Sequence, residues 1–208
     1  VVDIWEACVQ NELNNEPDYI EAMNQVIQEY SWGRDNLQDA LREFSVWRTV
    51  TGDRDNGAYF HDGAQWPSGA GLVMDTTLDG ASLILPATIE PNKAPYDYGF
   101  SYVRLENPQA ITGAMAMQFN GDPAVDWAVT LIQTRDNFQT IIERELPLSS
   151  GNGIMVINPG MLQQADDLTV AIVNLGTDQF DPDTGQDGLR RDYSITLLDA
   201  QPDTSLQM

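Results

Sequence analysis

The chain has few of the residues on which most metal and disulfide chemistry depends. Its 208 residues include one cysteine, Cys8, and one histidine, His61. A single cysteine excludes a disulfide within the chain, so we expect Cys8 to be a buried apolar residue on a helix or to pair outside the chain. A single histidine excludes HExxH zinc sites and two-histidine iron sites within these residues. We interpret His61 as a packing or surface residue.

Basic residues are also scarce. Ten lysines and arginines stand against 32 aspartates and glutamates, which gives a formal net charge of −22. No Lys/Arg cluster offsets this charge, so nucleic acid and anionic membrane surfaces are poor partners, whereas cations such as Ca²⁺ are attracted. No apolar run approaches the roughly 20 residues that span a bilayer. The chain starts without Met or a signal peptide, and we interpret Val1 as a cut end, from processing or from the design of the expressed segment.

The first third of the chain has the apolar spacing of amphipathic helices. Three stripes recur at intervals of three and four residues: Val2-Trp5-Val9-Leu13, Ile20-Met23-Ile27-Tyr30 and Leu37-Leu41-Phe44-Trp47. We expect Asp35 or Asn36 to cap the third helix, Gly52 to end it, and a short helix to follow around residues 58–64. Three helices in about fifty residues have too little area for a core of their own, so they need the rest of the chain or an upstream part to pack on.

From about residue 71 a period of two replaces the helical period. The predicted strands are LVMDTT, ASLILP, FSYVRLE, AMAMQFN, DWAVTLIQT, QTIIERE, IMVINP, LTVAIVN and DYSITLL. Three sets of alternate residues are expected to share a face: Met115-Met117-Phe119, Trp127-Val129-Leu131 and Tyr193-Ile195-Leu197. Short strands without intervening helices predict an antiparallel β-sandwich of jelly-roll or immunoglobulin-like type. We therefore predict an α+β chain, with a helical segment at residues 1–67, the end of a larger helical lobe, and a β-sandwich domain at residues 68–208.

The sequence contains no recognisable catalytic motif. There is no GxSxG nucleophile elbow, and the glycine-rich stretches GAGL and GNG lack the strand–loop–helix context of a phosphate-binding loop. Acidic residues are so numerous that some pair would fall at a glycosidase separation by chance. We therefore predict no catalytic residue within this chain.

Two short segments are candidates for binding. In DPDTGQDG, Asp181, Asp183 and Asp187 alternate with small residues, so their carboxylates can converge on a hard cation such as calcium. The loop is not an EF-hand, and the alternative interpretation is a solvated hairpin loop between two strands. In the turn-rich stretch APYDYG, Tyr96 and Tyr98 are the candidates for an exposed ligand contact.

A family resemblance rests on four motifs in the helical segment. These are Ile4-Trp5-Glu6, Phe44 with Trp47, Thr51-Gly52 with Arg54, and the stretch from Tyr59-Phe60 to Trp66-Pro67. Residues 1–67 thereby resemble the post-catalytic portion of the secreted zinc metalloproteases of myxobacteria and similar organisms. The resemblance implies a zinc-binding HExxH helix upstream, a β-rich C-terminal region and an extracellular or cell-surface location. No zinc ligand or catalytic residue of that family is matched within this chain.

Two hypotheses of function follow. In the first, the chain is the non-catalytic C-terminal region of a secreted metalloprotease-like protein. Its partner would be an upstream catalytic domain or processed N-terminal part, and its sandwich would contact substrate or a surface. In the second, it is a stand-alone secreted binding or adhesion module for glycan or protein, with calcium as a candidate cofactor. Zinc belongs only to the first hypothesis, and only in the upstream domain.

Overall fold

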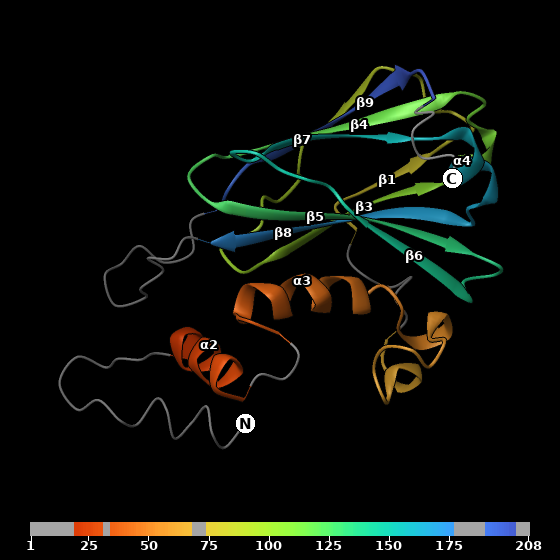
Figure 1. Cartoon of the computed structure of the whole chain (residues 1–208). Coiled ribbons are helices and arrows are strands. Elements are labelled where there is room, and N and C mark those ends of the chain that lie inside the picture. Colours follow the sequence, from red (N-terminus) through yellow and green to blue (C-terminus); the bar gives the residue numbers. More distant parts are fainter. Residues whose placement is uncertain (1–18, 31–33, 68–73, 177–189, 203–208) are drawn as a thin grey trace.

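Two β-sheets stacked face to face form the body of the protein (Figure 1). The structure is a computed structural model that describes residues 19–30, 34–67, 74–176 and 190–202. Its helices and helical turns are α2 (Tyr19–Tyr30), α3 (Leu37–Trp47), η1 (Gly52–Arg54), η2 (Gly63–Gln65), η4 (Pro108–Ala110) and α4 (Pro159–Gln164). Its strands are β1 (Thr76–Asp79), β2 (Ala87–Ile89), β3 (Phe100–Glu106), β4 (Ala114–Gly121), β5 (Asp126–Arg135), β6 (Thr140–Glu145), β7 (Asn152–Ile157), β8 (Asp167–Gly176) and β9 (Tyr193–Ala200).

The sheet topology agrees with a sandwich-like β fold but corrects one detail. One sheet has the order β1-β3-β8-β5-β6 and the other the order β2-β9-β4-β7. All strand pairs are antiparallel except β1 with β3, which run parallel with Thr76 opposite Val103. The prediction of a wholly antiparallel sandwich is therefore wrong at this edge. The chain leaves β1, forms β2 in the opposite sheet and returns to β3, and such a crossover allows parallel neighbours.

The core between the two sheets consists of side chains at alternate strand positions. All three sets of residues that were predicted to share a face belong to this one buried cluster. Because alternate residues of a strand point to opposite faces, these sets fix which face of β4, β5 and β9 is inside. Trp127 packs edge-on against Phe119 and Tyr193, with ring centroids 5.6 Å and 6.0 Å apart.

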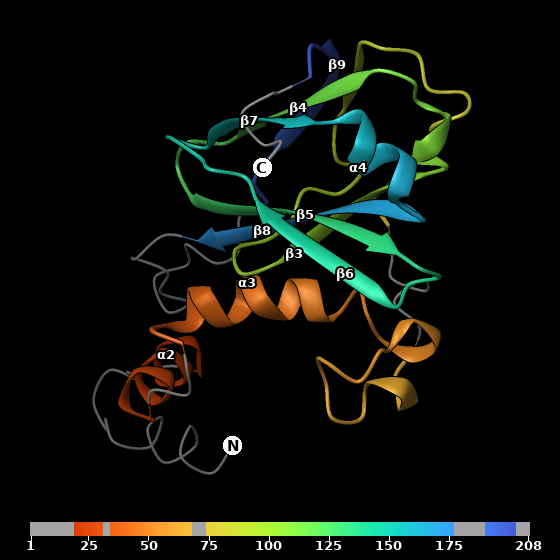
Figure 2. The same ribbon diagram turned by 45° about the vertical axis from the view of Figure 1, so that its right-hand side comes forward.

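The outer face of the five-stranded sheet is covered by α3 (Figure 2). Val46 of α3 packs with Tyr102, Ile132 and Ala171 of the sheet, and Leu41 packs against a neighbouring cluster around Val173. As a result β8 is buried at all ten of its positions. A strand in a sheet that is covered on both faces has a nearly continuous run of apolar residues, which explains why the sequence of β8 shows no alternation.

Helices α2 and α3 lie where the sequence predicts helices, whereas the stripe at residues 1–13 lies outside the described residues. The Asn36 side chain caps α3 by accepting a hydrogen bond from the Asp39 amide at 2.9 Å. The helix ends at Trp47, not at Gly52, since the chain turns at Arg48 through Thr49 and Val50 before it enters η1. Among the described residues, no helix is long and apolar enough to cross a membrane.

Two other local predictions are wrong. Residues 81–86 form a turn and not a strand, and the paired strand β2 follows them at Ala87–Ile89. Leu83 and Leu85 still pack against the core, so their apolar character reflects side-chain burial without strand pairing. The short helix expected around residues 58–64 is only a single helical turn at Gly63–Gln65.

A buried charge cluster fastens the end of the helical segment to the five-stranded sheet. The Nη2 atom of Arg54 donates to Oδ2 of Asp167 at 2.8 Å, and Arg104 Nε lies 3.5 Å from the same oxygen. The Thr134 hydroxyl donates to Oδ1 of Asp167 at 2.7 Å, and the Arg54 guanidinium lies over the Phe138 ring at 4.2 Å. Burial, followed by the charge of Arg54, lowers the pKa of Arg104. One carboxylate thus compensates two buried guanidinium groups.

This cluster predicts a large effect of Asp167→Asn on stability. The change keeps the shape but removes the charge that compensates Arg54 and Arg104, so we expect the free energy of unfolding to fall by about 3–5 kcal/mol. The matched control is Asp122→Asn, because Asp122 pairs with Arg191 at 3.3 Å in a partly exposed position. For Asp122→Asn we expect the free energy of unfolding to fall by less than about 1 kcal/mol. Urea unfolding measures both, and equal losses would show that the buried cluster does not hold the segment.

Candidate ligand-binding cleft

A surface cleft of about 420 Å³ lies where the segment before β3 meets the start of the last strand. Its lining combines an apolar floor with an exposed tyrosine and the side chains of one lysine and one arginine. The lining residues are Met74, Asp75, Asn92, Lys93, Ala94, Pro95, Tyr96, Gly99, Phe100, Ser101 and Arg190. One aromatic ring at the rim of an apolar cleft, with a few polar groups, is the usual composition of a small-ligand site.

Two hydrogen-bonding residues hold the segment that carries Tyr96. Asn174, fully buried in β8, donates from its side chain to the carboxylate of Asp97 at 3.0 Å and to the Pro95 carbonyl at 3.4 Å. On the other side, the Asp75 carboxylate accepts from the amides of Asn92 and Lys93 at 3.0 Å and 3.2 Å. The backbone around Tyr96 is therefore anchored at both ends, and the cleft does not need a ligand to form.

Tyr96 is the candidate contact residue that lines the cleft. Its side chain is 51% exposed, and the Arg190 guanidinium lies 4.3 Å from its ring centroid. Arg190 is itself oriented by a hydrogen bond of 3.0 Å from its Nη1 to the Ala94 carbonyl. A cation over one part of the ring holds the tyrosine side chain in place, so less side-chain entropy is lost when a ligand stacks on it. This arrangement suits stacking of a flat or ring-shaped group.

The floor of the cleft contains a hydroxyl pair that is structural. Ser101 Oγ and the Tyr193 hydroxyl are 2.6 Å apart and buried. Burial raises the pKa of Tyr193, with a smaller raising effect from the charge of Asp75 and a lowering effect from the Ser101 hydrogen bond. The phenol therefore keeps its proton at neutral pH and does not act as a base toward Ser101.

The structure places the second predicted contact residue, Tyr98, at a different site. Its backbone has φ 60°, in the left-handed region, and its side chain does not line the Tyr96 cleft. The Tyr98 ring lies so close to Gly176 that a Cβ there would be 3.0 Å from the ring. It also lines a separate cavity of about 290 Å³ beside α2 and α3, with Asn24 and Leu37 among its neighbours. The two tyrosines therefore do not form one contact surface.

The predicted cation-binding residues Asp181, Asp183 and Asp187 lie outside the described residues, as does Cys8. Within the described residues, no group of three or more His, Cys, Asp or Glu side chains is arranged to hold a metal ion. His61 is exposed in a turn, away from the cleft. The calcium hypothesis for the 181–188 loop therefore stays a prediction.

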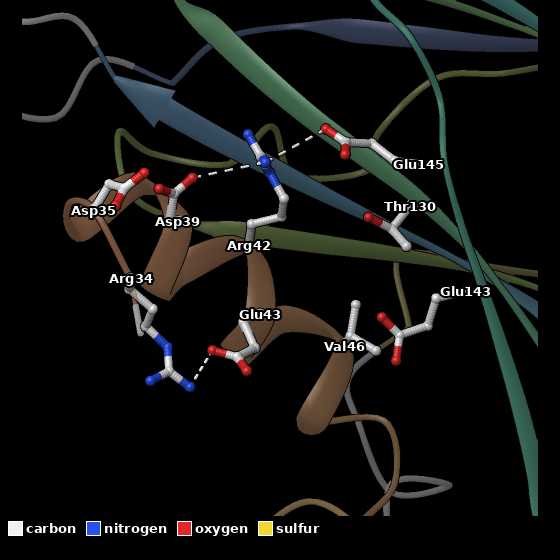
Figure 3. A pocket seen from close by; sticks show the side chains of 9 residues that line it. All are labelled: Arg34, Asp35, Asp39, Arg42, Glu43, Val46, Thr130, Glu143 and Glu145. Atoms are coloured by element: carbon white, nitrogen blue, oxygen red, sulfur yellow. Dashed lines mark ion pairs between the residues drawn. The ribbon is translucent and has the colours of Figure 1, made fainter. Parts of the chain in front are cut away.

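A second, charged groove of about 470 Å³ lies between α3 and strands β5 and β6 (Figure 3). Arg42 bridges its two sides, 3.7 Å from the Asp39 carboxylate and 3.5 Å from that of Glu145. Arg34, which precedes α3, pairs with Glu43 of the helix. The remaining lining residues are Asp35, Val46, Thr130 and Glu143. Its charges largely pair with one another, so we interpret the groove as part of the packing of α3 on the sheet.

Only some of the residues that line or support the Tyr96 cleft could be predicted from the sequence. Tyr96 stands in a turn-rich stretch, and its predicted exposure is confirmed, whereas its role in ligand contact stays a prediction. Asn174 and Arg190 lie more than seventy positions from Tyr96 in the sequence, and neither belongs to a motif. The one available signal was a polar Asn174 inside the apolar run of β8, because a buried amide must find hydrogen-bond partners.

The comparisons with known proteins leave the family open. No known protein family matches the sequence, and no curated protein matches it. Among solved structures, the chain is similar to the pre-peptidase C-terminal domain of collagenase from Bacillus anthracis, with 9% identity over 60% of this chain and 95% of that one, at a TM-score of 0.37. It is also similar to a structure of infectious bursal disease virus Gx strain, with 13% identity over 56% of this chain and 30% of that one, at a TM-score of 0.27. At these values neither likeness bears on function.

Two buried tyrosines, Tyr102 and Tyr193, and the partly buried Tyr59 predict a weakening of the fold at high pH. Burial raises the pKa of Tyr59, Tyr102 and Tyr193 above the ordinary value of 10.0. Above that pH the unfolded chain loses these protons while the native chain keeps them. The native state then binds more protons, so the free energy of unfolding is unaffected below about pH 10 and falls as the pH rises further.

A rapid pH jump to about 11, followed by tyrosinate absorbance, measures this directly. The native protein should show fewer ionised tyrosines than the same protein in denaturant. Tyr102→Phe should narrow the difference by one tyrosine, since that phenol is buried and donates to the Ser45 carbonyl at 3.1 Å. Identical titration of the native and denatured protein would contradict the assignment.

Proposed function

We propose that this chain is the non-catalytic C-terminal region of a secreted metalloprotease-like protein, and that its β-sandwich contacts substrate or a surface through the Tyr96 cleft. The observation that carries the binding role is the exposed Tyr96 ring, held by Arg190 at the rim of a preformed cleft. The metalloprotease context rests on the resemblance of residues 1–67. The extracellular location and the upstream catalytic partner belong to that context.

The placement of the resemblance motifs supports a structural role for the helical segment. Trp47 packs edge-on against Phe60 at 5.2 Å between centroids, and Phe60 stacks on Trp66 at 4.5 Å. The Thr51 hydroxyl donates to the Pro67 carbonyl at 2.7 Å, and Arg54 pairs with Asp167 of the sandwich. The motif residues thus make packing contacts and the attachment to the sheet, as befits a segment that joins a sandwich to another domain.

A stand-alone binding or adhesion module for glycan or protein is the alternative function, because the same cleft would serve it. The two proposals differ in what the gene encodes before Val1. The first requires an HExxH helix upstream, and the second does not. The jelly-roll or immunoglobulin-like subclass of the sandwich does not discriminate between them, since such folds host many functions.

Tyr96→Ala tests the binding role of the cleft. The probes are an array of immobilised neutral glycans and immobilised casein as an extended polypeptide. We expect binding by the unmodified chain to weaken roughly tenfold or more in the variant, because stacking on an aromatic ring contributes about 1–3 kcal/mol to affinity. Tyr30→Ala is the matched control, since Tyr30 is 49% exposed at the end of α2.

Binding that is lost in Tyr96→Ala and kept in Tyr30→Ala supports the proposal. Equal binding by all three proteins, or no binding of either probe by the unmodified chain, counts against the cleft. Melting temperatures of the variants are measured alongside, so that loss of fold is distinguished from loss of contact.

The calcium prediction is tested by isothermal titration of the chain with CaCl₂. If Asp181, Asp183 and Asp187 hold the ion, heat is released and the melting temperature rises with calcium concentration. Asp183→Asn should abolish both effects, whereas Asp199→Asn in β9 should leave them unchanged. No heat and no shift in melting temperature would leave a solvated hairpin loop.

A further inference from the structure

The Tyr96 cleft contains the single lysine of the chain. The other nine basic residues are arginines, and Lys93 is exposed in the lining of the cleft. Arg190, which is also exposed, lines the same cleft. In a protein with a formal net charge of −22, two exposed cations beside one aromatic ring form a local exception to the charge of the whole.

Neither cation is matched by a carboxylate. Within the part of the chain that the structure describes, the side chains of Lys93 and Arg190 form no ion pair. The acidic residue of the lining is Asp75, and its carboxylate accepts from the backbone amides of Asn92 and Lys93. The lining therefore carries two positive charges against one negative charge, and both cationic side chains can meet an anion that enters the cleft.

Backbone hydrogen bonds join the two segments that carry these cations. The Arg191 amide donates to the Pro95 carbonyl at 3.1 Å, and Nη1 of Arg190 donates to the Ala94 carbonyl at 3.0 Å. The residues just before β9 are thus fixed to the segment of Lys93. A guanidinium has five N–H donors, so Arg190 keeps donors for a ligand beside the one that it gives to the backbone.

Most of the remaining lining is apolar. Met74, Ala94, Pro95 and Phe100 present apolar side chains to the cleft. A hydroxyl-rich sugar would leave hydroxyl groups without hydrogen-bond partners against such a surface, and burying them unpaired would oppose binding. A group with an apolar body and one negative charge matches both the floor and the two cations.

We propose that the Tyr96 cleft binds the C-terminal residue of a polypeptide. Its free α-carboxylate is held by Lys93 and Arg190, and its apolar side chain lies on the floor beside Tyr96. Hydrogen bonds from cations to a carboxylate are roughly twice as strong as neutral ones, and the planar guanidinium matches the carboxylate in shape. Hydrolysis of a peptide bond creates such chain ends, so the inference rests on the proposed function and names the part of the substrate that the sandwich contacts.

The net charge of the chain is compatible with this ligand. Repulsion by distant acidic residues is screened over about 8 Å at physiological ionic strength, whereas the attraction to Lys93 and Arg190 acts at contact. A single terminal carboxylate is therefore accommodated. An acidic polymer would add charges that lie beyond the two cations and are repelled by the rest of the surface.

Two peptides that differ only in their last group test the proposal. Acetyl-glycyl-phenylalanine carries a free carboxylate, and its C-terminal amide is neutral. NMR titration of the chain with each peptide gives the two dissociation constants, and we expect the free acid to bind about tenfold more tightly or better. Lys93→Gln should weaken binding of the free acid roughly fivefold or more and leave binding of the amide unchanged. Arg144→Gln is the matched control, because it removes the same charge from β6 at the far edge of the five-stranded sheet.

A preference for the free acid that is lost in Lys93→Gln and kept in Arg144→Gln supports the proposal. Equal binding of acid and amide, with both weakened by Tyr96→Ala, overturns it and leaves the cleft of the proposed function standing. No binding of either peptide also overturns it, whereas the proposed function is decided by the glycan and casein probes. Glucuronic acid is a third probe, and binding as tight as that of the peptide acid would show an acidic-sugar site and overturn the proposal.

Discussion

The helical segment and the sandwich meet at one buried carboxylate. Asp167 accepts hydrogen bonds from Arg54, at the end of the helical segment, and from Thr134 in β5, while Arg104 of β3 lies beside it. Three parts of the chain thus converge on a single negative charge that compensates two cations in surroundings poor in water. Moving the segment away would separate Arg54 from Asp167 and break a buried, hydrogen-bonded ion pair, which costs more than losing an exposed ion pair. The position of α3 on the sheet follows from this constraint together with the apolar contacts of Val46.

How much of the fold could be predicted also depends on where α3 covers the sheet, because a strand that is covered on both faces loses the alternation of apolar and polar residues. In β9 burial alternates along most of the strand, and the inward set around Ile195 was predicted correctly. The inward set around Met117 in β4 was also predicted correctly, although the first four residues of that strand are all buried. The parallel edge of β1 and β3 was not predictable, because it depends on a crossover into the other sheet. Leu83 and Leu85 misled the prediction because a side chain can reach the core from backbone that pairs with no strand.

Only the part of the candidate site that lies within one short stretch of sequence could be predicted. The turn-rich stretch around Tyr96 marked an exposed aromatic residue, but nothing in it showed that Tyr98 lines another cavity. Tyr98 also has φ 60°, a conformation that is rare for a tyrosine and that sequence patterns do not predict. Only folding brings Asn174 to the segment of Tyr96, so the amide within the apolar run of β8 signals a need for hydrogen-bond partners but not which partners it finds.

Charge narrows the class of ligand that can approach the Tyr96 cleft. Of the ten basic residues, Arg54 and Arg104 are buried, and Arg34, Arg42 and Arg191 each form an ion pair. Half of the positive charge is therefore engaged within the fold, and a field set by 32 acidic residues acts on any approaching molecule. That field opposes polyanions at long range. Stacking on a tyrosine ring is short-ranged and independent of net charge, so the binding role proposed for the cleft is compatible with a neutral glycan or an uncharged stretch of polypeptide and less so with an acidic polymer.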